Sequence, residues 1–100
     1  MVPSDAFQRA ESVAPVEGLL SRVRAYYEDR QWREGQQLLE RAIRLSPQNA
    51  EAWYLMARGY YHLGELAKSQ RFAMRAGDLI SVASPLGKLN AELLQKLTSR

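Results

Sequence analysis

The chain has 100 residues, of which 46% are hydrophobic and 25% are charged, and its formal net charge is +3. This length and composition indicate one small globular domain. There is no cysteine, which excludes disulfides, cysteine nucleophiles and zinc–cysteine sites. No apolar run approaches the roughly 18 residues of a membrane-spanning helix, so we expect no direct membrane insertion.

Residues 1–16 contain two prolines, Pro3 and Pro15, among small and polar residues. Such a composition interrupts regular structure and is typical of linkers. We therefore expect a flexible N-terminal arm or linker over residues 1–16 and a folded domain over residues 17–100.

Helical periodicity and capping residues predict five helices in this domain. Asn49 is a good N-cap for the third helix, and Ser84 followed by Pro85 marks the start of the fifth. The predicted helices span residues 17–29, 32–45, 50–63, 65–80 and 85–98.

The last predicted helix has an apolar stripe, which is made of Leu86, Leu89, Leu93, Leu94 and Leu97. Such a helix can cover the exposed end of an array of helices and turn its polar side to water. The alternative is that this stripe is a docking surface or a dimer seam.

The sequence repeats with a period of 34 residues. Eight positions between 17 and 46 carry the same residue as the position 34 residues later, more than chance identity would give. The pairs are Glu17/Glu51, Arg24/Arg58, Tyr26/Tyr60, Tyr27/Tyr61, Gln36/Gln70, Arg41/Arg75, Ala42/Ala76 and Leu45/Leu79.

The second unit has Trp53, Met56, Ala57 and Tyr60 at the spacing of a known repeat, followed by the turn Leu63-Gly64-Glu65. In these residues and this period the chain resembles the tetratricopeptide-repeat family. The resemblance implies an all-α fold with two helix–turn–helix repeats, over about 16–49 and 50–83. A C-terminal capping helix over about 85–98 would complete a short right-handed solenoid of five helices.

The first unit departs from the family pattern. Val23 is bulky where two helices should cross closely, and we expect Gly35 to compensate by conserving volume. The resemblance also implies that Tyr26 and its counterpart Tyr60 pack in the core. The next residue along, Tyr27 in this unit, is rotated by about 100° and is expected to face a concave groove.

In this family the first helix of each repeat lines the concave surface. The residues expected to bind a partner there are Leu20, Arg24, Tyr27, Tyr54, Arg58, Tyr61, His62 and Lys88. Tyrosine and arginine are enriched at binding hot spots because they combine large area with hydrogen bonding. The alternative is an aromatic and cationic surface that only stabilises the array.

The residue types for catalysis are not gathered in the sequence. His62 is the only histidine, and no phosphate-binding glycine loop occurs. We therefore expect no enzymatic activity, no cofactor and no metal, and instead a module that binds another protein or peptide. Charges of both signs alternate along the chain, which argues against a nucleic-acid partner.

A narrower resemblance is to the LpoP-type lipoprotein activators of bifunctional peptidoglycan synthases, in which a linker leads to a five-helix tetratricopeptide domain. It implies a class A penicillin-binding protein as partner and a lipid anchor upstream of this chain. The location would then be the periplasmic face of the outer membrane, and otherwise the cytoplasm. The alternatives are a pilotin-like or secretion-chaperone-like assembly adaptor and a self-associating scaffold. We expect a monomer or a weak homodimer.

Overall fold

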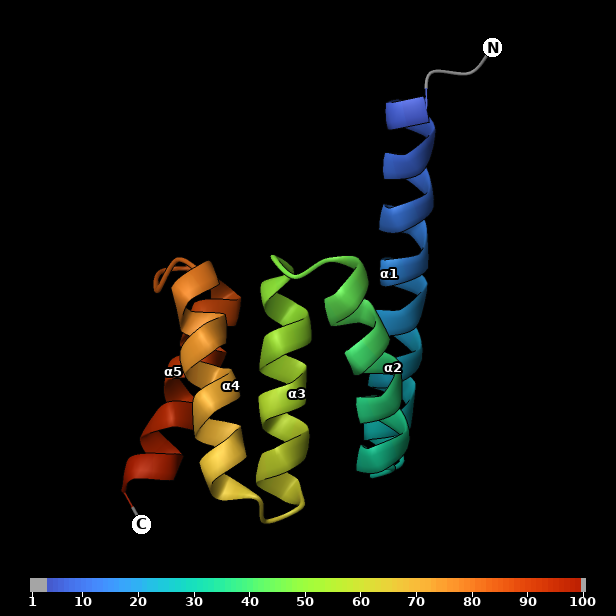
Figure 1. The fold of residues 1–100 in the computed structure, drawn as a ribbon. Coiled ribbons are helices and arrows are strands. Elements are labelled where there is room, and N and C mark those ends of the chain that lie inside the picture. Colours follow the sequence, from blue (N-terminus) through green and yellow to red (C-terminus); the bar gives the residue numbers. More distant parts are fainter. Residues whose placement is uncertain (1–3, 100) are drawn as a thin grey trace.

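A computed structural model describes the backbone of residues 4–99 and the side chains of residues 15–99. The described residues form five α-helices and no strand, and the helices run side by side (Figure 1). They are α1 (Ser4–Glu28), α2 (Trp32–Leu45), α3 (Ala50–His62), α4 (Leu66–Leu79) and α5 (Pro85–Thr98). The predicted all-α fold with five helices is confirmed.

Helix α1 begins at Ser4, whereas the sequence predicted a start near residue 17. Its N-terminal turns project beyond the ends of the other helices (Figure 1). Pro15 lies inside the helix and does not end it. Val16, which we had assigned to the arm, is buried in the core because the apolar stripe of α1 begins there. A flexible arm before Val16 stays a prediction, and its first three residues lie outside the described ones.

The predicted caps of α3 and α5 are confirmed. The side-chain oxygen of Asn49 accepts a hydrogen bond from the Ala52 N–H at 3.0 Å. The Ser84 hydroxyl oxygen accepts one from the Gly87 N–H, also at 3.0 Å. Each cap satisfies a backbone donor that has no partner within its helix, which fixes where the helix begins.

The turns inside the two units share one backbone conformation. Gly64 has φ +80° and Arg30, at the equivalent position, has φ +60°. The N–H of the residue after each donates to the carbonyl of Tyr60 or Tyr26, at 2.9 Å in both turns. The 34-residue period is thus visible in the backbone even where the glycine is missing.

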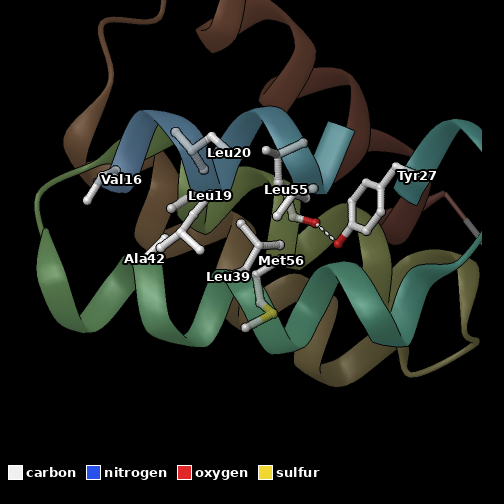
Figure 2. Close-up of a cluster of buried hydrophobic side chains, with 10 residues drawn as sticks. Val16, Leu19, Leu20, Tyr27, Leu39, Ala42, Leu55 and Met56 are labelled. Carbon is white, nitrogen blue, oxygen red and sulfur yellow. Dashed lines mark hydrogen bonds between the residues drawn. The ribbon is translucent and has the colours of Figure 1, made fainter. Parts of the chain in front are cut away.

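Two apolar clusters hold the helices together. The larger joins α1, α2 and α3, and Figure 2 shows part of it. The smaller joins α3, α4 and α5 through Ala57, Ala73 and Leu93. Consecutive helices pack against one another, and α3 also touches α5. At the close crossing of α3 and α4, Ser69 is fully buried and its hydroxyl donates to the Ala57 carbonyl at 2.7 Å.

Candidate functional site: a groove formed by α1, α3 and α5

A groove of about 480 Å³ is formed by the first helix of each unit together with α5. Aromatic, aliphatic and charged side chains share its walls. They are Arg24, Glu51, Tyr54, Leu55, Arg58, Tyr61, His62, Leu86, Leu89, Glu92, Leu93 and Lys96. The mixture suits recognition of a segment that is both apolar and charged.

Arg24 is held by an ion pair across the groove wall. Its guanidinium donates to the Glu51 carboxylate at 3.0 Å from Nε and at 2.7 and 2.9 Å from Nη2. Both side chains are partly exposed, so the pair stabilises the fold by only about 0–1 kcal/mol. The pair joins α1 to α3 and cancels the charge of Arg24 at this end of the groove.

Tyr27 lies beneath the groove and not in it. Its side chain is 3% exposed, and its hydroxyl donates to the Leu55 carbonyl at 2.8 Å (Figure 2). Burial raises the pKa of Tyr27 well above its usual range, so the phenol stays protonated. Gly35 and Gly59 leave the space that the ring fills, since a Cβ on Gly35 would lie 2.5 Å from a ring carbon.

A second hollow, also of about 480 Å³, adjoins the groove where the α1–α2 turn meets the end of α3. There the Trp32 ring stacks on His62, with centroids 4.1 Å apart and planes 5° from parallel. Arg58 lines both hollows and lies over the Tyr27 ring, 5.8 Å from its centroid. Burial lowers the pKa of His62, and the charges of Arg58, Arg30 and Lys96 lower it further.

A family profile described as tetratricopeptide repeat matches residues 26–78, more than half of the chain. The chain belongs to the tetratricopeptide-repeat family. Members of this family generally mediate interactions between proteins and typically serve as non-catalytic scaffolds. No curated protein matches the chain. The matched segment contains both turns of the helix–turn–helix units.

Five of the eight residues that the sequence predicted for the concave face line the groove. They are Arg24, Tyr54, Arg58, Tyr61 and His62. Their location follows from the tetratricopeptide register, which places the same face of α1 and α3 on one side of the molecule.

Leu20 and Tyr27 were wrongly placed in the groove, although Tyr27 also lines the adjoining hollow. Leu20 is fully buried because α1 presents a continuous apolar stripe to α2 and α3. In this first tetratricopeptide unit Tyr27 enters the core, whereas Tyr26 is only half-buried and lines a shallow hollow beside Arg22 and Asp29. The sequence predicted that Val23 would fill the space opposite Gly35, but Tyr27 fills it.

Lys88 was also wrongly placed, because it is not among the residues that line the groove. The groove side of α5 carries Leu86, Leu89 and Lys96, with Lys88 exposed elsewhere. The sequence carried a signal for this, since the leucines recur at helical spacing. The sequence left a cap and a docking surface or dimer seam as alternatives for these leucines: Leu94 and Leu97 pack on the smaller cluster, whereas Leu86 and Leu89 line the groove.

In the described part of the chain, no helix is long and apolar enough to cross a membrane. Within the same residues, no three histidine, aspartate or glutamate side chains gather as a metal site.

Proposed function

We propose that this tetratricopeptide domain binds a partner protein or peptide in the groove between α1, α3 and α5 and carries out no chemistry there. The groove itself supports this, because Tyr54, Tyr61 and Arg58 converge on it with leucines of α5. The few residues that contribute most of the binding energy at protein interfaces are enriched in tryptophan, tyrosine and arginine. The proposed contact residues are therefore Arg24, Tyr54, Arg58, Tyr61 and His62, together with Leu86, Leu89 and Lys96.

We further propose that the partner is the periplasmic part of a class A penicillin-binding protein and that this chain activates it. Support comes from the resemblance to the LpoP-type activators, which implies five helices as found here. Helix α1 extends into the region that the resemblance assigns to a linker. The resemblance therefore rests on the helical domain and not on the linker. The chain would then act in the periplasm, with a lipid anchor upstream.

Binding and synthase activity can be measured with three proteins. The groove variant is Arg58→Glu/Tyr61→Ala, and the matched control is Arg44→Glu/Met74→Ala, which makes a similar change at exposed residues of α2 and α4. Each is first shown to be folded by its helical circular dichroism. We measure binding to a purified class A synthase, its rate of glycan polymerisation, and the proteins captured from a lysate.

We expect the wild type and the control to bind and stimulate the synthase, and the groove variant to bind about tenfold more weakly or not at all. If the synthase is not bound but another captured protein is lost only by the groove variant, the groove proposal stands and the synthase is the wrong partner. Equal capture of every protein by the wild type, the control and the groove variant would overturn the groove proposal.

A further inference from the structure

The groove changes character along its length. Near the start of α3 and α5, which run in the same direction (Figure 1), it is lined by Tyr54, Leu86 and Leu89 together with the mutually neutralised Arg24–Glu51 pair. The side chain of Leu89 is 47% exposed, so a partner can cover it. Near the C-terminal ends of the same helices the walls carry Arg58 and Lys96. An apolar half is thus followed by a basic half.

The positive charges of the basic half form no ion pair with a carboxylate among the described residues. Among residues 15–99, Arg24 has Glu51 as its partner, whereas neither Arg58 nor Lys96 has a carboxylate within 4.0 Å. Glu92 lines the groove and Glu28 the adjoining hollow, but neither forms an ion pair within that range. Both cations, Arg58 and Lys96, lie close enough to His62 to add to the lowering of its pKa that burial begins.

Arg30 extends this positive region from the α1–α2 turn into the adjoining hollow, beside His62. Three cations from α3, α5 and the α1–α2 turn therefore lie around His62. Three positive charges are matched better by several carboxylates of one segment than by the single carboxylate of a chain terminus. Carboxylates bound by arginine form short, charge-assisted hydrogen bonds.

We infer that the groove binds a partner segment in which apolar side chains stand next to aspartate or glutamate. The apolar side chains would cover Leu86 and Leu89, and the carboxylates would lie between Arg58 and Lys96. This inference rests on the proposed function, because it names the chemistry of the partner at the same site. The segment is recognised by its acidic side chains and not by a terminal carboxylate.

The test is selection from a displayed library of random short peptides, followed by affinity measurements on the selected peptides with amidated C-termini. Amidation removes the terminal carboxylate and so separates the two sources of negative charge. The basic half is probed with Arg58→Gln/Lys96→Gln. The matched control, Arg41→Gln/Arg44→Gln, removes the same charge from exposed residues of α2. The apolar half is probed with Leu89→Ser.

We expect wild-type selection to enrich peptides with aspartate or glutamate beside apolar residues. Their affinity should fall about tenfold with Arg58→Gln/Lys96→Gln, fall with Leu89→Ser, and stay unchanged with the control. Raised salt should weaken the wild type more than the Arg58→Gln/Lys96→Gln variant, because screening acts on the lost charge pairs.

Three results would overturn the inference: no acidic enrichment, loss of binding on amidation, or no selected peptide that the Arg58→Gln/Lys96→Gln variant binds more weakly. If Leu89→Ser still weakens binding in any of these cases, the groove remains the binding site and only the acidic assignment fails. If no groove substitution weakens any peptide, the proposed function fails as well.

Discussion

At the scale of single residues, Tyr27 shows how a tyrosine is assigned to the core or to the surface. Tyr26 and Tyr27 are adjacent, and their chemistry is the same. Tyr27 is buried because Gly35 and Gly59 leave room for its ring and the Leu55 carbonyl accepts its hydroxyl. The apolar stripe of α1, which reads Val16, Leu19, Leu20, Val23 and Tyr27 at helical spacing, would have identified it. The family pattern instead favoured Tyr26.

Gly35→Ala should destabilise the domain even though alanine favours helices. The added methyl would meet ring carbons of Tyr27, and overpacking typically costs about 1–3 kcal/mol, less the roughly 1 kcal/mol gained in helix propensity. Gly18→Ala is the matched control, because no atom lies within 4 Å of its added Cβ. That change should stabilise the domain by about 0.5–1 kcal/mol. Urea unfolding of both variants measures the two effects, and an equal shift of both midpoints would contradict the packing assigned to Tyr27.

At the scale of elements, the helices and their turns follow from local sequence with one exception. Four helices lie within one residue of their predicted limits, because caps and turns fix their ends. The exception is α1, where proline was expected to prevent a helix. Proline lacks one N–H and restricts the residue before it, but a helix can continue past a single proline. The first turn also lacks its glycine, so Arg30 adopts the left-handed conformation that Gly64 takes in the second.

Arg30→Gly should stabilise the α1–α2 turn. A residue with a Cβ is strained by about 1–2 kcal/mol in the left-handed region, whereas glycine is not. The greater chain entropy of glycine when unfolded offsets part of this, so we expect a net gain of about 0.5–1 kcal/mol. The free energy of unfolding measures it. Gly64→Ala, at the equivalent turn, should lower that free energy, and a loss of stability in both variants would contradict the shared turn geometry.

At the scale of the whole molecule, two tetratricopeptide units and α5 make one small folded body with a thin margin of stability. Its core includes a phenol that must stay protonated, so stability is linked to pH. Burial is the main cause of the raised pKa of Tyr27, opposed by the charge of Arg58. The folded domain therefore holds this proton more tightly than the unfolded chain, whose tyrosines titrate near about pH 10.

The contribution of Tyr27 to the free energy of unfolding should consequently be fully present below about pH 10, and it should fall as the pH rises above that value. One proton released on unfolding gives a slope of up to about 1.4 kcal/mol per pH unit. Tyr27→Phe should unfold more easily at neutral pH, by about 1 kcal/mol for the lost hydrogen bond, but should show a shallower decline at high pH. Denaturant unfolding between pH 8 and 11 compares the two proteins. Parallel slopes would show that Tyr27 is not the linked group.

The sequence by itself determined the repeat, the limits of four of the five helices, the turns, and most of the groove residues on α1 and α3. These depend on local spacing and on a period that carries a known register. Only the tertiary structure decided which tyrosine enters the core, which residues of α5 line the groove, and that Arg24 is neutralised by Glu51. Those outcomes depend on the volume left by a neighbouring helix and on contacts between residues 27 and 28 positions apart in the chain. A pattern along one helix does not contain that information.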